Sequence, residues 1–279
     1  MNIVGKSVND LYLRACGQLV VSGREVAGTH ELRNVSLTLL DITDSVCTLR
    51  PHFSIPYMLG ELAWYFLGRD DVAFISHFSS MWARISDDGV TSNSAYGDII
   101  FCRYGYNQVE QVIKILTDDP DSRRAVINFN TPNPCRSTTK DDPCTIALEF
   151  AIRDGALVCT CMMRSNDIYL GTPYDIAFFT TLQRYIADRL GVTYGTYTHF
   201  AVSLHVYDRN WDQVRSVWVG GRGRVAAAPK IKIDTQAMMR AISEFGVWLA
   251  GADVNNADVK RELVETVDKN GGLKYANQD

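Results

Sequence analysis

The sequence lacks the features of secreted and membrane-bound proteins. No run of about 18 uncharged apolar residues occurs anywhere, so we expect no membrane span. The N-terminal segment MNIVGKSVNDLYLRA has no apolar core and no small-residue cleavage site. The seven cysteines are an odd number and do not follow a secreted disulfide spacing. We therefore expect a cytoplasmic protein whose cysteines are reduced.

Metal-ligand spacings and excess positive charge are also missing. The five histidines never pair at metal-ligand spacing, and Cys159 and Cys161 form C-x-C rather than C-x-x-C. We therefore predict no metal site. Lys and Arg total 28 against 32 Asp and Glu, giving a net charge of −4. This balance argues against a protein that coats nucleic acid, although a few arginines can still bind a single phosphate.

The composition is that of an ordinary globular protein. Its 279 residues are 46% apolar and 22% charged, enough for a large core. We expect one domain over residues 1–279. Helical periodicity and strand-like runs alternate irregularly, which favours an α+β fold over a doubly wound parallel sheet. The ranges predicted as helices are 56–67, 108–116, 173–190, 235–249 and 257–267, and those predicted as strands are 125–129, 146–152, 156–163 and 198–207.

Turn residues divide these elements. Arg153-Asp154-Gly155 predicts a hairpin between two of the strands. Residues 130–143 predict a polar loop, and residues 220–229, GGRGRVAAAP, predict a second flexible segment.

Cys144 is the candidate nucleophile. It follows Pro143 where the polar loop meets a predicted strand. A lone cysteine is most often an inert, buried small residue. A reactive thiolate needs a positive neighbourhood, which the arginines described next could supply.

Arginines occur at two strand ends. Arg123 and Arg124 stand directly before an apolar strand, where a solvated pair is the simplest interpretation. Arg164 and Ser165 begin a polar run at the end of another strand. A guanidinium beside a hydroxyl suits bidentate phosphate binding.

Three further polar residues interrupt apolar patterns. Glu61 lies within an apolar helix; if it points inward, burial raises its pKa and makes it a general acid or base, and if it points outward it is an ordinary surface acid. His205 and Tyr207 alternate along a strand and therefore project from one face. They could bind a sugar hydroxyl or be satisfied core residues.

The order of these motifs resembles the thymidylate synthase family from about Arg24 to Tyr207. Cys144 and Arg164 stand 20 residues apart, which is similar to the family spacing. The motifs in chain order are E-L-x-W-Y at Glu61, Y-G at Tyr96, D-P-x-S-R-R ending at Arg124, P-C at Cys144, R-S-x-D-x-x-L-G-x-P at Arg164 and H-x-Y at His205.

The resemblance implies a mixed, kinked sheet flanked by helices and a homodimer packed sheet to sheet. It implies that Cys144 attacks C6 of a pyrimidine nucleotide, that Glu61 and Tyr96 handle protons, and that C5 receives the methylene of 5,10-methylenetetrahydrofolate. The implied nucleotide ligands are Arg24, Arg164, Ser165, His205 and Tyr207, with Arg123 and Arg124 donated by the partner subunit. The implied folate-site residues are Trp82, Asp167, Leu170, Gly171 and Tyr174.

Two departures from the family pattern bear on the substrate. Thr145 follows the nucleophile where the synthases have histidine, and Asp175 stands where they have the asparagine that pairs with uracil. Cytosine presents an amino donor and an acceptor at N3, the reverse of uracil, and an aspartate supplies acceptors for the amino group. Both departures resemble the phage deoxycytidylate hydroxymethylases.

The resemblance therefore implies a deoxycytidylate 5-hydroxymethylase, and leaves open whether it serves DNA modification or antibiotic synthesis. The alternatives are a dCMP 5-methyltransferase, a CMP 5-hydroxymethylase and, more distantly, a dUMP-specific thymidylate synthase. A non-catalytic nucleotide- or RNA-binding protein is a rival of another class, against which the retention of Cys144 and Glu61 argues. The C-terminal residues Ala-Asn-Gln-Asp differ from the apolar tail with which the synthases cover folate.

Overall fold

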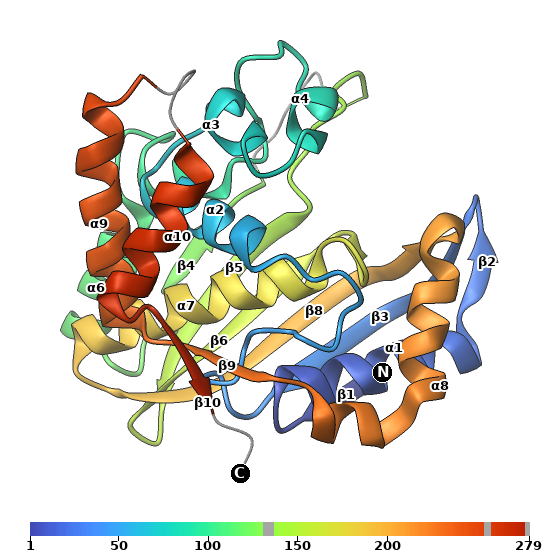
Figure 1. Cartoon of the computed structure of the whole chain (residues 1–279). Helices are drawn as coiled ribbons and strands as arrows, with labels where there is room; N and C mark the ends of the chain where they lie inside the picture. The colour runs from blue at the N-terminus through green and yellow to red at the C-terminus, as the bar shows by residue number, and fades with distance from the viewer. Residues whose placement is uncertain (131–136, 254–257, 277–279) are drawn as a thin grey trace.

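The computed structural model describes residues 1–130, 137–253 and 258–276, and Figure 1 shows its elements. The strands are β1 (Asn2–Gly5), β2 (Arg24–Val26), β3 (Thr29–Leu39), β4 (Val126–Asn128), β5 (Thr145–Arg153), β6 (Ala156–Met163), β7 (Asn166–Asp167), β8 (Thr193–Tyr207), β9 (Lys230–Ile233) and β10 (Leu273–Ala276). The α-helices are α1 (Val8–Ser22), α2 (Ile55–Phe66), α3 (Val72–Ser76), α4 (Met81–Ile85), α5 (Tyr96–Phe101), α6 (Gln108–Asp118), α7 (Thr172–Leu190), α8 (Trp211–Ala227), α9 (Thr235–Gly251) and α10 (Val259–Asn270).

The main sheet is mixed and has the strand order β1-β3-β8-β6-β5-β4, with β2 paired to β3 and β7 to β8. Strands β3 and β8 are antiparallel, whereas β6 and β8 are parallel. The α+β prediction is therefore confirmed. Along β6, buried residues alternate with half-buried ones, so one face of the sheet is closed by helices more completely than the other.

The alternation of buried and more exposed residues along β3 and β8 shifts by one residue at one level of the sheet. In β3, Arg33 and Asn34 are both exposed between buried Leu32 and Val35, and Asn34 has a left-handed φ of 54°. In the facing strand, Val202 and Ser203 are both half-buried at the matching level. Two adjacent strands thus shift their alternation at the same level, a pattern typical of the kinked sheet that the resemblance implies.

Helix α7 is the central helix and crosses the sheet in Figure 1. Pro173 lies in its first turn, where a missing N–H costs nothing, and Gly191 ends it with a φ of 67°. Most of its residues are buried, since it packs on β6 and β8 and also on α2, α6 and α9. The rigid first turn of α7 therefore fixes the position of Asp175.

The predicted elements agree with the structure apart from a few residues at their ends. The hairpin at Asp154 and Gly155 is confirmed, since both have positive φ between β5 and β6. Strand β8 begins five residues earlier than predicted, at Thr193.

The predicted flexible segment at residues 220–229 is wrong for most of its length. Residues up to Ala227 continue α8, and the helix deviates at Gly221, whose φ is 61°. The alanines and arginines that follow the glycines favour helix enough to resume it. Part of the predicted loop, residues 131–136, and the last residues, 277–279, lie outside the described residues. Over the ranges given above, no helix is both long and apolar enough to cross a membrane.

Candidate active site

A cavity of about 600 Å³ opens where α2, α4, α5, the end of β6 and the start of α7 meet. It gathers all of the predicted site residues except Arg24, Arg123 and Arg124. Those lining the cavity are Glu61, Trp82, Tyr96, Cys144, Arg164, Ser165, Asp167, Leu170, Gly171, Tyr174, Asp175, His205 and Tyr207. Residues more than a hundred positions apart in the chain thus share one site.

Cys144 stands immediately before β5 and faces Arg164 at the end of β6. The Arg164 backbone N–H donates to the Cys144 carbonyl oxygen at 2.9 Å, which fixes the nucleophile's backbone against the neighbouring strand. Burial raises the pKa of the Cys144 thiol, while the Arg164 guanidinium lowers it and Asp175 raises it further. The thiol is therefore held mainly protonated until a proton acceptor or a positive charge approaches.

The Arg164 guanidinium is held by the loop that precedes the nucleophile. It donates to the carbonyl oxygens of Pro143 at 3.1 Å and Asp142 at 2.7 Å, and lies 3.3 Å from the Asp142 carboxylate. This arginine therefore positions the loop as well as facing the cavity.

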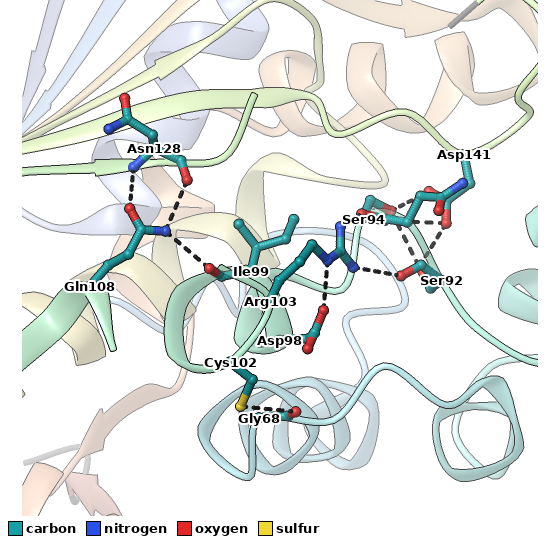
Figure 2. A network of polar contacts seen from close by, with 11 residues as sticks. Gly68, Ser92, Ser94, Asp98, Ile99, Cys102, Arg103, Gln108, Asn128 and Asp141 are labelled. Atoms are coloured by element: carbon teal, nitrogen blue, oxygen red, sulfur yellow. Dashed lines mark hydrogen bonds and ion pairs between the residues drawn. The ribbon is translucent and has the colours of Figure 1, made fainter. Parts of the chain in front are cut away.

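A buried carboxylate ties the same loop to the start of α5. Asp141 accepts hydrogen bonds from the Ser92 hydroxyl at 2.7 Å and from the Ser94 hydroxyl, as Figure 2 shows. The Ser94 backbone N–H lies 3.3 Å from the same carboxylate. This contact was not predicted from the sequence, although the polar run Asn93-Ser94 next to Tyr96 was a signal for it.

Arg103 secures the other side of this contact. It pairs with Asp98 at 2.6 Å and donates to the carbonyl oxygens of Asn93 and Ser92, at 2.6 and 3.2 Å (Figure 2). The segment that carries Tyr96 and the loop that carries Cys144 are thereby held as one unit. The Tyr96 ring packs on Tyr65, with ring centroids 5.4 Å apart.

Glu61 points inward from α2 and is 8% exposed. The Tyr57 hydroxyl donates to its Oε1 at 2.6 Å, and the Trp82 indole N–H donates to the Tyr57 oxygen at 3.1 Å. Burial raises the pKa of Glu61 to about 8, although the hydrogen bond from Tyr57 opposes the shift. Tyr57 was missed from the sequence, yet its spacing of four residues from Glu61 on one helix was the available signal.

Asp175 is the second buried acid. It lies in the first turn of α7, where its backbone N–H donates to the Gly171 carbonyl oxygen at 3.0 Å. The Asn166 side-chain amide donates to Asp175 Oδ2 at 2.8 Å. Burial raises the pKa of Asp175 to about 7, so both of its protonation states are populated near neutral pH.

The residues expected to face folate form an apolar wall with one acid. Asp167 accepts from the backbone N–H groups of Tyr169 and Leu170 through Oδ1, at 2.7 and 3.0 Å. Its buried Oδ2 accepts no hydrogen bond from any residue that the structure describes. Tyr174 stacks on Phe53, with ring centroids 4.8 Å apart. An orphaned acceptor beside aromatic surface suits a planar ligand with N–H donors.

His205 and Tyr207 lie in the last three residues of strand β8. Their rings are perpendicular, with centroids 5.4 Å apart, and both line the cavity. The strand register places Arg24 opposite Glu31, and Glu31 opposite His205. Arg24 is therefore level with His205 but two strands away, and its exposed side chain does not line the cavity.

Arg123 and Arg124 lie before the edge strand β4 and are exposed. Neither lines the cavity of its own chain. Within the described ranges, no group of three or more His, Cys, Asp or Glu side chains could hold a metal ion.

Comparison with known proteins identifies the family of this chain. The family model for thymidylate synthase matches residues 22–253. A deoxyuridylate hydroxymethyltransferase of Bacillus phage SP01 is 33% identical over 164 residues, covering 54% of this chain and 43% of the relative. One of Pseudomonas phage M6 is 30% identical over 161 residues, covering 57% and 46%. A putative thymidylate synthase of Methanocaldococcus jannaschii is 39% identical over 114 residues, covering 39% and 51%.

These alignments span about half the length of each relative. The family match covers most of this chain, including every residue that lines the cavity. The chain belongs to the thymidylate synthase family.

Proposed function

We propose that this member of the thymidylate synthase family is a deoxycytidylate 5-hydroxymethylase. The observation that carries the proposal is the buried Asp175 carboxyl group, which shares one cavity with Cys144 and Glu61. The net reaction combines dCMP, 5,10-methylenetetrahydrofolate and water to give 5-hydroxymethyl-dCMP and tetrahydrofolate.

Cys144 is the nucleophile in this proposal. Its thiolate adds to C6 of the cytosine ring, which makes C5 electron-rich. The Cys144 proton must leave before attack, because the thiolate is the reactive form. Arg164, the cation that lowers the pKa of Cys144, favours this loss. A nucleotide phosphate that draws Arg164 away from the Asp142 carboxylate would change the charge around the thiol.

Asp175 reads the base. A neutral carboxyl group has one donor and one acceptor, which match N3 and the 4-amino group of cytosine. The pKa of about 7 makes the neutral form available at physiological pH. If the proton moves to N3 instead, the same two hydrogen bonds remain, and the ring becomes a better acceptor for the Cys144 thiolate.

Glu61 handles protons in this proposal. Its pKa of about 8 keeps it protonated at neutral pH, so it can donate a proton and later accept one. Tyr57 and Trp82 fix its position through two successive hydrogen bonds. Glu61 can also activate the water that adds to the one-carbon unit.

Methylenetetrahydrofolate supplies a one-carbon unit at the oxidation level of formaldehyde. Trp82, Leu170 and Tyr174 provide the apolar surface for its rings. Asp167 Oδ2, which no described residue satisfies, is the acceptor available for its N–H groups. The cavity thus has a polar end for the nucleotide and an aromatic wall for the folate.

The proposed enzyme works as a homodimer packed sheet to sheet. The half-buried face of β6 and β8 supplies the apolar contact surface. In this arrangement Arg123 and Arg124 of one subunit reach the phosphate bound by Arg24 and Arg164 of the other.

A second candidate is deoxyuridylate hydroxymethylation, because two of the similar phage proteins carry that name. It shares every step with the first and differs in the base that Asp175 reads. A dCMP methyltransferase differs instead in the fate of the methylene, and a CMP hydroxymethylase in the sugar.

One experiment separates these candidates. The protein is incubated with methylenetetrahydrofolate and dCMP, CMP or dUMP in turn, and the products are weighed by mass spectrometry. We expect 5-hydroxymethyl-dCMP and tetrahydrofolate. A 5-methyl product with dihydrofolate would make the protein a methyltransferase, and conversion of dUMP alone would overturn the assignment of the base.

A further inference from the structure

Asn166 is buried beside the acid that reads the base. It lies in the short strand β7, is 3% exposed and donates to Asp175 Oδ2 at 2.8 Å. Its own Oδ1 accepts from the Thr172 hydroxyl, whose oxygen also lies 3.2 Å from the Asp167 carbonyl oxygen. A Cβ on Gly171 would lie 3.1 Å from Asp175 Oδ2 and 3.4 Å from Asn166 Nδ2, so the glycine leaves room for this contact.

An isolated carboxylic acid does not distinguish cytosine from uracil well. Its proton can sit on either oxygen, so it can offer donor and acceptor in either order. Cytosine and uracil differ in this order, because one presents a donor at position 4 and the other an acceptor. A neutral acid discriminates between them when something fixes the oxygen that carries the proton.

Asn166 is placed to fix which oxygen of Asp175 carries the proton. An amide N–H that donates to Oδ2 favours this oxygen as an acceptor, which leaves the proton to Oδ1. At the other end of the side chain, the Thr172 hydroxyl donates to the amide oxygen. The donor and acceptor of Asp175 therefore have a set order along the base edge.

We propose that Asn166 is a specificity-determining residue that acts through Asp175, by fixing the order of donor and acceptor that a pyrimidine must match. This inference rests on the proposed function, since it assumes that Asp175 faces the base. Asn166 itself is a positioning residue.

Other ionisable groups act on Asp175 from the elements around it. Asp167 on β7 raises the pKa of Asp175, whereas the hydrogen bond from Asn166 lowers it. The remaining titratable groups coupled to Asp175 are Glu61 and Tyr65 on α2, Tyr96 on α5, Cys144 before β5, Cys161 on β6 and Tyr197 on β8. All of them stay in place when Asn166 is changed, so a change in the pH dependence reports on the lost N–H.

The test is calorimetric binding of dCMP and of dUMP, without folate, between pH 6 and 9. Asn166→Ala removes the amide, while Asn166→Leu keeps its approximate shape, removes the donor and adds no ionisable group. Thr180→Val is the matched control, because Thr180 is equally buried on α7 and bonds to the Ile176 carbonyl oxygen instead.

We expect the ratio of dCMP to dUMP affinity to fall by up to about tenfold in both Asn166 variants, the scale of one net hydrogen bond between neutral groups. The pH above which dCMP binding weakens should also rise, because removing the donor raises the pKa of Asp175. An unchanged ratio and an unchanged midpoint in a folded Asn166→Leu protein would overturn the inference.

The same data test the proposed function separately. If the wild type prefers dUMP, the base assignment fails, while the change of ratio in the variants still measures the role of Asn166. If the wild type binds both nucleotides equally, both proposals are wrong.

Discussion

The two ends of the cavity are built differently. One end, which we call the base end because we propose that it holds the base, encloses a thiol and two acids of a single chain. These are Cys144, Glu61 and Asp175, and burial raises the pKa of each. The other end, which we call the phosphate end because we propose that it holds the phosphate, has one arginine in the cavity. Arg164 lines the cavity, while Arg24, Arg123 and Arg124 do not. Arg164 is moreover held by the loop before Cys144.

This difference shows how chemistry and anion binding are divided in the proposed enzyme. Groups that exchange protons need a dry environment, which the fold of a single chain provides. A phosphate dianion needs several guanidinium groups that stay hydrated until it arrives. Exposed arginines meet that need, and a second subunit can bring them to the site.

The largest effect should come from the base end. Cys144→Ser replaces the thiolate with an alcohol of far higher pKa, so turnover of dCMP should fall by more than about 10⁴-fold. Binding of dCMP should remain, because the arginines are unchanged. Initial rates and calorimetry measure the two quantities.

Cys102→Ser is the matched control for this variant, since Cys102 is exposed and outside the cavity. Turnover near the wild-type rate in Cys144→Ser would exclude the covalent mechanism.

The next effect concerns the acid that distinguishes the base. Asp175→Asn should lower the ratio of kcat/KM for dCMP to that for dUMP by about 10²- to 10⁴-fold, because buried polar groups would face a mismatched edge. Thr145 still replaces the histidine of the synthases, so the gain on dUMP should be partial. Steady-state kinetics with both nucleotides measure the ratio. If it stays constant in a folded protein, Asp175 serves only the first turn of α7, where a negative charge is favoured by the helix dipole.

The structure brings Cys144, Glu61 and Asp175 into one cavity as expected but leaves Arg123 and Arg124 outside it, for a physical reason. Cys144, Glu61 and Asp175 stand in motifs whose positions follow from one chain's fold, so local spacing locates them. The side-chain orientations of Arg123 and Arg124 depend on what packs against β4. The hydrophobic pattern of the chain carries no information about that neighbour. Asp141 was missed because its role depends on a contact formed across the fold, whereas Asn166 and Tyr57 contact acids only nine and four positions away and were missed despite that local signal.

The fold itself was largely predictable for a similar reason. Periodicity located α7 and β6 to within a residue, because tertiary packing and local pattern agree there. The glycines near residue 220 misled the prediction, since α8 tolerates one non-helical residue, Gly221, and continues. A glycine allows a helix to break, and the helix propensities of the flanking residues determine whether the helix continues.

A smaller effect tests the phosphate end. If Arg124 acts across the dimer, Arg124→Ala and Cys144→Ala proteins should each be nearly inactive. After random subunit exchange, half of the dimers are mixed, and each of these has one site with both wild-type groups. Activity should therefore recover to about a quarter of the wild-type level. The rate of the equimolar mixture measures it, with exchange verified by native mass spectrometry. No recovery after complete exchange would place Arg124 in its own subunit's site or outside any site.

The last effect returns to the base end and concerns stability without ligands. The pKa of Glu61 is about 8 in the folded protein, against 4.5 as the ordinary value. Between these values the folded state binds one more proton than the unfolded state, so the free energy of unfolding falls as pH rises, by at most about 1.4 kcal/mol per pH unit. Asp175 adds a slope of the same sign up to its pKa of about 7, and His199, whose pKa burial lowers to about 3, opposes both at lower pH.

The comparison of Glu61→Gln with the wild type isolates one of these contributions, because Asp175 and His199 are present in both. The wild type should lose stability relative to Glu61→Gln steadily from pH 4.5 to about 8, and the difference should become constant above that. Urea unfolding across this range measures it, with Glu265→Gln on the exposed side of α10 as the control. Parallel curves for Glu61→Gln and the wild type would mean that Glu61 is charged in the folded protein, and the base end would then be wetter than its burial indicates.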